Sequence, residues 1–181
     1  MRLFAAVLPP DPAVRELGAA VDQLEPLADA TDLRWTERAG WHFTLAFLGE
    51  VEAYLIPGLE ERLGETARDH DPFRLAVSGG GHFGDRALWA GAAGEVEALE
   101  QLAKGVRAAA RAAGVAVEKE HPYVPHLTLA RSPGGTALRP YADALAGFAS
   151  APWTVAELAL VRSGEQPRYK TVGAWPLGRA G

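Results

Sequence analysis

The chain has 181 residues, and its 48% hydrophobic and 23% charged content is that of an ordinary globular protein with one core or two small lobes. It contains no cysteine, which excludes a disulfide scaffold, a thiolate zinc site and a cysteine nucleophile. With a formal net charge of −5 it lacks the Lys and Arg surplus that long nucleic-acid tracts require, so a nucleic-acid substrate would be held by a short end or a single nucleotide.

The first predicted elements are a strand and a helix. Residues 3–8 form a short apolar run that ends at Pro9 and Pro10, which is typical of a buried strand. The run is too short for a signal peptide or a membrane span, so we expect a cytoplasmic enzyme with no membrane partner. Asp11 is expected to cap a helix with Pro12 at its first position. Apolar residues then follow at helical spacing, namely Val14, Leu17, Val21, Leu24 and Leu27.

The next elements again alternate between strands and helices. The apolar run 43–48 predicts a strand, and Pro57 is expected to open a helix that carries Leu59, Leu63 and Ala67. Residues 73–77 alternate like a strand, which Ser78 and the three glycines 79–81 are expected to end.

The second half repeats this order. A helix is expected from about Glu95 to Gly114, followed by a short strand with Val115 and Val117. Thr136 is expected to cap a further helix, and two strands over 154–162 and 169–175 end the chain. Because helix, histidine strand, helix and strand occur twice, we expect residues 1–181 to form a single domain of two similar, interleaved lobes.

Two short motifs of the same form lie nearly half the chain apart. They read His42-Phe43-Thr44-Leu45 and His126-Leu127-Thr128-Leu129, and histidine occurs only five times in the chain. Side chains on a strand alternate between its two faces, so each histidine shares a face with the threonine of its motif while the apolar pair enters the core. If the two strands come together, two imidazoles and two hydroxyls surround one pocket.

Such a set of side chains suits phosphoester chemistry. A neutral imidazole can take a proton from water, a protonated one can give a proton to the leaving oxygen, and the hydroxyls can donate to phosphoryl oxygens. Arg131 follows the second motif and would add a fixed positive charge. In a regular strand, however, Arg131 points to the face of Leu129, so it reaches the phosphate only beyond the strand's end or at a bulge.

The remaining candidate residues have simpler interpretations. His70, His82 and His121 are expected in loops, where only His82 and His121 could line the cleft. Phe83 and Trp89 could contact a base, although core packing is the more common use of such aromatic residues. Two histidines without a carboxylate trio or thiolates are too few to hold a metal, so we expect neither a metal nor another cofactor.

The two motifs resemble those of the 2H phosphoesterase superfamily, and in particular the bacterial and archaeal RNA 2′,3′-cyclic phosphodiesterases once named 2′-5′ RNA ligases. The stretches that carry the resemblance are WHFTLAFLG at 41–49 and PHLTLAR at 125–131. The opening residues, Arg2-Leu3-Phe4 with Leu8-Pro9, and the tail from 160 to 177 are also similar to the family pattern. Trp41 and Phe43 depart from it by replacing other bulky or aliphatic residues.

The resemblance implies an α+β, bilobal, pseudo-symmetric fold in which two antiparallel sheets line a central cleft and helices lie outside. It also implies metal-independent hydrolysis of RNA 2′,3′-cyclic phosphate ends to 2′-phosphomonoesters. In that scheme His42 is the proton donor and His126 the proton acceptor, while Thr44, Thr128 and Arg131 bind the substrate. The residues alone support the histidine pair but not which member is the acid.

Two alternatives to this function stay open at this point. The chain could hydrolyse a cyclic phosphate on a small nucleotide-derived substrate, or it could be a non-catalytic module that binds RNA ends. Simple phosphate binding would favour Arg or Lys over the intact His and Thr pairs, which argues against the second alternative. The expected partners are RNA ends or small nucleotides with a cyclic phosphate, and the protein is expected to be a monomer.

Overall fold

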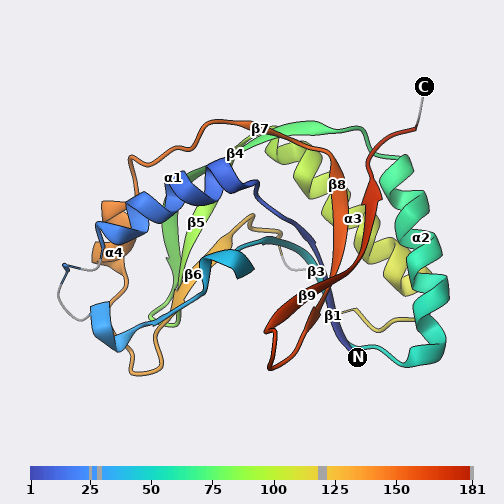
Figure 1. The fold of residues 1–181 in the computed structure, drawn as a ribbon, viewed down its shortest axis with the longest axis horizontal. Helices are drawn as coiled ribbons and strands as arrows, with labels where there is room; N and C mark the ends of the chain where they lie inside the picture. The colour runs from blue at the N-terminus through green and yellow to red at the C-terminus, as the bar shows by residue number, and fades with distance from the viewer. Residues whose placement is uncertain (25, 28–29, 118–121, 180–181) are drawn as a thin grey trace.

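The computed structural model describes residues 1–24, 26–27, 30–117 and 122–179, which fold into two antiparallel sheets with helices on their outer sides (Figure 1). Sheet A has the strand order β3-β1-β8-β9 and sheet B the order β2-β6-β5-β4-β7. The strands of sheet A are β1 (Arg2–Val7), β3 (Phe43–Glu50), β8 (Glu157–Ser163) and β9 (Tyr169–Pro176). Those of sheet B are β2 (Arg34–Trp35), β4 (Phe73–Phe83), β5 (Ala87–Gly94), β6 (Leu127–Arg131) and β7 (Trp153–Val155). The expected α+β fold with two antiparallel sheets and outer helices is confirmed.

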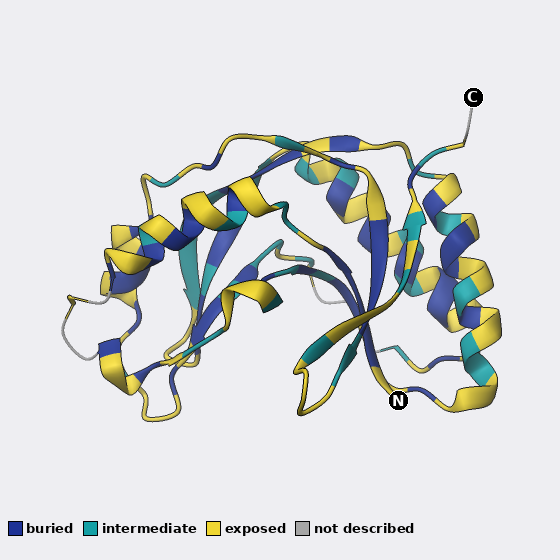
Figure 2. Cartoon of the chain, viewed as in Figure 1, coloured by how far each residue is buried: buried dark blue, intermediate teal, exposed yellow. Residues whose placement is uncertain are grey.

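Each sheet has its own pair of helices. Helices α2 (Ile56–Arg68) and α3 (Val96–Ala112) pack beside sheet A, whereas α1 (Asp11–Asp22) and α4 (Arg139–Ala144) pack on sheet B (Figure 1). Short 3₁₀ turns lie at Ala30–Asp32, Arg38–Gly40 and Ala53–Leu55. The buried residues of α2 are Leu59, Leu63, Gly64 and Ala67, which include the apolar stripe that the sequence predicts. The opposite faces of the helices are exposed (Figure 2).

The chain crosses between the sheets several times. Strand β1 belongs to sheet A, α1 then packs on sheet B, β3 returns to sheet A, and β4 and β5 belong to sheet B again. Neither sheet is therefore built from one continuous half of the sequence. The main core fills the space between the sheets' outer faces and their helices, with fully buried leucines such as Leu45, Leu63 and Leu129.

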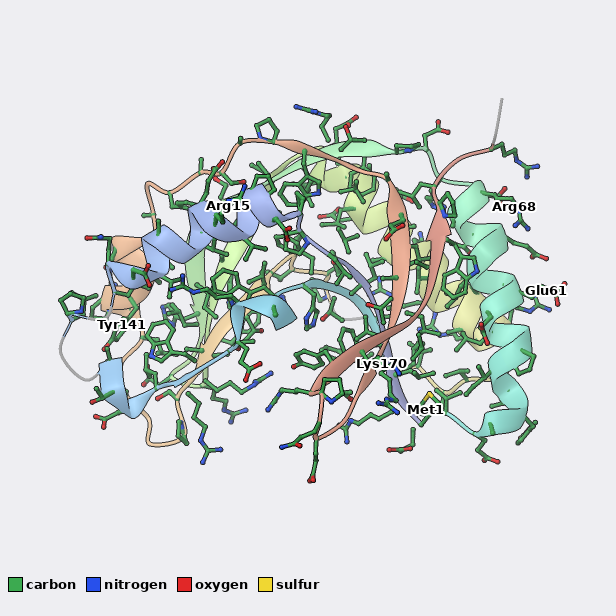
Figure 3. The ribbon with its side chains drawn as sticks, viewed as in Figure 1. Met1, Arg15, Glu61, Arg68, Tyr141 and Lys170 are labelled. Atoms are coloured by element: carbon green, nitrogen blue, oxygen red, sulfur yellow. The ribbon has the colours of Figure 1, made fainter. Side chains whose placement is uncertain are left out.

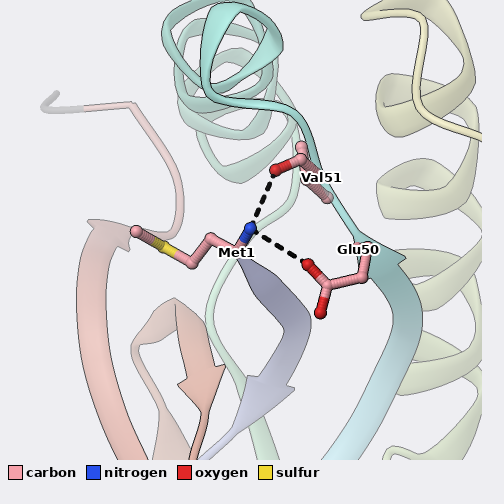
Figure 4. A network of polar contacts seen from close by, with 3 residues as sticks. All are labelled: Met1, Glu50 and Val51. Carbon is pink, nitrogen blue, oxygen red and sulfur yellow. Dashed lines mark hydrogen bonds and ion pairs between the residues drawn. The ribbon is translucent and has the colours of Figure 1, made fainter.

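The start of β1 is fastened to the end of β3. The N-terminal ammonium of Met1 donates to the Glu50 carboxylate at 3.2 Å and to the Val51 carbonyl at 3.1 Å (Figure 4). Glu50 is largely exposed, so the ion pair itself adds little stability. Together with the ladder between β1 and β3, these contacts hold the register of the strand that carries the first histidine motif.

Four local predictions were wrong at the ends of elements. Pro10, in extended conformation, is the N-cap of α1 in place of Asp11, and α1 ends at Asp22, short of Leu27. Residues 115–117 are not a strand, and Leu138, not Thr136, precedes the first residue of α4. Residue types and spacing leave the ends of short elements uncertain by one or two residues or more, because the cap geometry itself is not visible in the pattern.

Two strand predictions were wrong because of long-range pairing. The expected strand over 154–162 is divided between β7 in sheet B and β8 in sheet A, with the crossing at Ala156. Strand β4 continues through the glycines to Phe83 and pairs with β5, a hairpin that the sequence analysis did not predict. A side chain at Gly81 would lie 2.3 Å from the Trp89 ring, and one at Gly80 would lie 2.7 Å from Leu145, so close packing explains these glycines inside a strand.

Candidate active site

The two motif histidines occupy equivalent places, each directly before the first residue of its strand. His42 precedes β3 and His126 precedes β6. The Nδ1 atom of His42 lies 2.8 Å from the Gly40 carbonyl oxygen, and that of His126 lies 2.7 Å from the Val124 carbonyl oxygen. A carbonyl oxygen only accepts, so each Nδ1 carries a proton and donates it. In both residues Nε2 is therefore the nitrogen available for proton exchange with a ligand.

Each imidazole is flanked by two aromatic rings from its own sheet. The ring centroid of His42 lies 4.5 Å from that of Phe4 on β1 and 5.3 Å from that of Tyr169 on β9. The ring centroid of His126 lies 4.8 Å from that of Phe83 on β4 and 6.0 Å from that of Trp89 on β5. These contacts limit the orientations that each imidazole can adopt, and they place Phe83 and Trp89 beside the second motif.

The strand ladders show which side chains share a face with the histidines. In sheet A, Thr44 pairs with Ala6, and Ala6 lies with Phe4 in a small cluster away from the main core. In sheet B, Thr128 pairs with Trp89. We call these two faces, which carry Thr44 and Thr128, the inner faces of the sheets. Neither threonine hydroxyl has a hydrogen-bond partner among the described residues, so both are free for a ligand.

A bulge in β6 brings Arg131 onto the inner face. Ala87 pairs with Arg131 and Trp89 pairs with Thr128, so two steps along β5 match three steps along β6, and Leu129 is the extra residue. Because Ala87 and Trp89 are two residues apart on β5, they share a face, and so do their partners Arg131 and Thr128. The geometry therefore meets the condition under which Arg131 can reach a phosphate beside His126.

Strand β3 has the same bulge at the same place. Ala6 pairs with Thr44 and Phe4 pairs with Phe47, and Leu45 is skipped in the ladder just as Leu129 is in β6. Phe47 therefore holds in the first motif the position that Arg131 holds in the second, and its side chain is 64% exposed. Phe47 is not among the site residues predicted from the sequence, although its place three residues after Thr44 matches that of Arg131 after Thr128.

The surroundings of His42 disfavour its protonated form. Burial lowers the pKa of His42 below its ordinary value of 6.5, and the nearby His126 lowers this pKa further, against the opposing effect of the Gly40 carbonyl. The imidazoles are thus close enough to affect each other although their strands belong to different sheets. Without a ligand, His42 favours its neutral form. A bound phosphate would favour the protonated form.

A half-buried tyrosine links the two motif segments. The hydroxyl of Tyr123, three residues before His126, donates to the carbonyl oxygen of Thr44 at 2.8 Å. Burial raises the pKa of Tyr123 far above its ordinary value, so the hydroxyl keeps its proton and remains a donor. The bond joins the segment that leads into β6 to strand β3, and no β-ladder joins these two strands.

A pocket of about 60 Å³ opens beside His42 on the inner face of sheet A. Its walls are formed by β1, β8, β9 and the turn before β3, and the residues that line it are Phe4, Leu8, Ala39, Gly40, Trp41, His42, Val161, Tyr169 and Thr171. This volume would enclose only a small part of a ligand bound at His42.

The other candidate histidines lie apart from these motifs or outside the described residues. His70 follows α2, where its Nδ1 lies 2.8 Å from the Thr66 carbonyl oxygen, and His82 on β4 makes the same kind of contact with Gly84. His121 falls outside the described residues. Within the described part of the chain, no three or more His, Asp or Glu side chains gather in a way that could hold a metal ion.

Comparison with known proteins identifies the family. The family model of the 2′-5′ RNA ligase superfamily matches residues 9–167. The chain belongs to this superfamily. It is 33% identical to the RNA 2′,3′-cyclic phosphodiesterase of Archaeoglobus fulgidus over 72% of each protein. It is also 35% identical over 150 residues to a protein of the same name from Geobacillus stearothermophilus, a match that covers 79% of this chain but only 47% of that relative.

Solved structures show the same fold. The crystal structure of TT0787 from Thermus thermophilus has a TM-score of 0.77 at 28% identity and covers 99% of this chain and 100% of that one. The structure of E. coli LigT complexed with 3′-AMP has a TM-score of 0.77 at 25% identity and covers 98% of each chain. In the described residues of this superfamily member, no helix is long and apolar enough to cross a membrane.

Proposed function

We propose that this protein hydrolyses the 2′,3′-cyclic phosphate at the end of an RNA to a 2′-phosphomonoester, without a metal, by two-histidine acid–base catalysis. The observation that carries the proposal is the matched pair of motif histidines. Both precede equivalent strands, both donate Nδ1–H to the carbonyl two residues earlier, and both leave Nε2 for a ligand. Supporting this, the relatives from two organisms bear the name RNA 2′,3′-cyclic phosphodiesterase.

In the proposed reaction His126 accepts a proton from water, and the resulting nucleophile attacks the cyclic phosphorus. The bond between phosphorus and the 3′-oxygen breaks, and His42 donates the proton that this oxygen takes up. The phosphate stays on the 2′-oxygen. An in-line displacement requires the entering and leaving oxygens on opposite sides of phosphorus, which two imidazoles on separate sheets can serve.

The other inner-face residues complete the proposed site. Thr44 and Thr128 would donate their hydroxyls to phosphoryl oxygens, and Arg131 would stabilise the charge that these oxygens carry. The negative charge of the bound phosphate would also raise the pKa of His42 and so favour the protonated acid that the scheme requires. A base could contact the aromatic rings beside the histidines, among them Phe83 and Trp89.

Product analysis tests the proposal. An oligonucleotide that ends in a 2′,3′-cyclic phosphate is incubated with the protein in the presence and absence of EDTA, and the products are separated from standards that end in 2′- and 3′-phosphate. We expect only the 2′-phosphate, at equal rates in both incubations. A 3′-phosphate product would contradict the proposed bond cleavage, and loss of activity in EDTA would contradict a metal-independent reaction.

The alternative of a small nucleotide-derived substrate keeps the same residues and chemistry. The pocket beside His42 is the observation that favours it, because a pocket of this volume can enclose no more than part of a nucleotide. Turnover of a cyclic mononucleotide, measured beside that of the cyclic-ended oligonucleotide, separates the two substrate classes.

A further inference from the structure

A second arginine lies beside Arg131 in sheet B. In the ladder between β2 and β6, Arg34 pairs directly with Arg131, and the next residue, Trp35, pairs with Ala130. Directly paired residues of antiparallel strands share a face, so Arg34 lies on the inner face with Arg131. Its neighbour confirms this orientation, because Trp35 is half-buried with its ring 6.5 Å from that of the buried Tyr141 on α4, on the outer side of the sheet.

Within the part of the chain that the structure describes, this pair of arginines has no counter-charge. Both residues are exposed, and no described residue forms a hydrogen bond or an ion pair with either guanidinium group. By contrast Arg38, four residues after Arg34, forms an ion pair with Asp22. Like charges directly opposite each other repel, and this chain has more acidic than basic residues with which to neutralise them. The pair is therefore arranged as a site for an anion that the protein does not itself supply.

The ladders also place an aromatic ring in the same row. Ala87 pairs with Arg131 on one side and with Phe83 on the other, so Arg34, Arg131, Ala87 and Phe83 follow one another across the inner face of sheet B. The Phe83 ring is 40% exposed and lies next to His126. Positive charge and an aromatic ring, separated by a small alanine, are the groups that bind the phosphates and a base of single-stranded nucleic acid.

We propose that Arg34 binds the internucleotide phosphate that precedes the cyclic end, so that the site selects RNA ends over cyclic mononucleotides. Strand β2 is the edge of sheet B, one strand further than β6 from Phe83 and Trp89, which flank His126. Arg131 is thus the arginine nearer to the reacting phosphate, and Arg34 the one placed for the next phosphate along the strand. This inference rests on the proposed function and names its substrate class more narrowly.

The test compares two substrates that differ by one phosphate and one nucleoside. The values of kcat/KM are measured on a 2′,3′-cyclic mononucleotide and on a dinucleotide that ends in a 2′,3′-cyclic phosphate. Arg34→Ala should lower kcat/KM on the dinucleotide about tenfold, the effect of one charge-assisted hydrogen bond, and far less on the mononucleotide. Arg34→Lys should retain part of the activity, because it keeps the charge but not the planar fork. Arg131→Ala should lower turnover of both substrates.

Arg15→Ala is the matched control, because Arg15 lies on α1, away from the inner faces (Figure 3). This variant should leave kcat/KM unchanged on both substrates. Binding of the dinucleotide product with its 2′-phosphate is measured in parallel over a range of salt concentrations. In Arg34→Ala the slope of log Kd against log salt should shrink by about 0.7, the contribution of one single-strand phosphate.

Equal losses on both substrates, or no loss on the dinucleotide, would overturn the role of Arg34. If the wild-type protein hydrolyses neither substrate, the proposed function fails, and product binding then decides the question of Arg34 separately. Weaker binding with a reduced salt slope in Arg34→Ala would still support the phosphate contact. Binding and slope equal to those of the wild type would overturn it.

Discussion

His42 and His126 share one hydrogen-bonding pattern in two different surroundings. The carbonyl two residues earlier holds Nδ1 of each ring, and two aromatic rings restrict each imidazole. The arrangement selects one tautomer at both places, so a proton can enter or leave only through Nε2. Burial then distinguishes His42, because it lowers the pKa of this residue.

The pH dependence of catalysis should follow from this lowered pKa. The active protein carries one proton on the pair, because the acid must be protonated while the base is neutral, so a second proton taken up at low pH inactivates it. The lowered pKa of His42 makes this second proton harder to add. We therefore expect a bell-shaped profile of kcat/KM whose acid limb lies below 6.5. The acid limb of kcat should lie higher, because bound phosphate favours the protonated imidazole. The limits belong to the pair and not to single residues. A flat profile of kcat/KM across about pH 5–9 would contradict the scheme.

The threonines should contribute less than the histidines. Thr44→Val and Thr128→Val keep the shape of the side chain and remove only the hydroxyl, so each should lower kcat/KM by about tenfold, the effect of one hydrogen bond to a charged group. Steady-state kinetics of both single variants and of the double variant measure this effect. Unaltered kinetics in the folded double variant would remove both hydroxyls from the site.

At the scale of elements, the paired bulges at Leu45 and Leu129 shape the inner faces. Each bulge inserts one buried leucine after the motif threonine and turns the residue two places further on, Phe47 or Arg131, to the face of that threonine. The two sheets thus offer an aromatic ring at one place and a positive charge at the equivalent place. At this equivalent position the first motif can contact an apolar or aromatic group of a ligand, whereas the second can contact an anionic group.

The sequence shows the motifs clearly, but it indicates the bulge in β6 only as one of two conditions under which Arg131 reaches the phosphate, and it does not indicate the bulge in β3. His42 and Thr44 are recognisable because a strand has a period of two and the same frame recurs at His126. A bulge adds one apolar residue to an apolar run, and this leaves no mark on that pattern. In a regular strand Arg131 therefore points away from the site, and nothing in the sequence marks Arg34, because the two-residue strand β2 depends wholly on its pairing with β6.

The glycines of β4 are a second feature that the local sequence does not explain. Glycine usually weakens a strand, and so Ser78 and the glycines after it were interpreted as a strand end. In the structure a bulge lies between Val77 and Gly80, with Gly79 at a φ of 70°, and the strand then continues under the Trp89 ring. The reason for these glycines lies in a neighbouring strand, which local sequence does not reveal.

The hydrogen bond between Tyr123 and Thr44 should support both the stability of the fold and the position of the site. Tyr123→Phe keeps the half-buried ring and leaves the Thr44 carbonyl oxygen without this donor, which should lower the free energy of unfolding by about 1–3 kcal/mol. Because the bond joins the segment before His126 to β3, kcat should also fall severalfold while KM changes little. Tyr54→Phe, at a residue that is 75% exposed, is the control. A less stable variant with wild-type kcat would show that Tyr123 supports the fold but does not position the site.

At the scale of the whole molecule, the chain reaches one candidate site by crossing repeatedly between its sheets. Strands β1, β3 and β9 contribute the residues around His42, whereas β4, β5 and β6 contribute those around His126. The net charge of −5 agrees with a site that grips a few phosphates through single arginines. Binding should therefore weaken only gently as salt rises.

The central claim is that His42 and His126 act together on one phosphate, and turnover of a cyclic-ended oligonucleotide by their alanine variants tests it most directly. His42→Ala and His126→Ala should each fold normally, as thermal unfolding will show, and each should lose about 10²–10⁴-fold in kcat. The double variant should be little worse than either single variant, because groups that act as a unit are not additive. His70→Ala, at the end of α2, should keep full activity. Near wild-type turnover in either folded single variant of the pair would contradict the two-histidine mechanism.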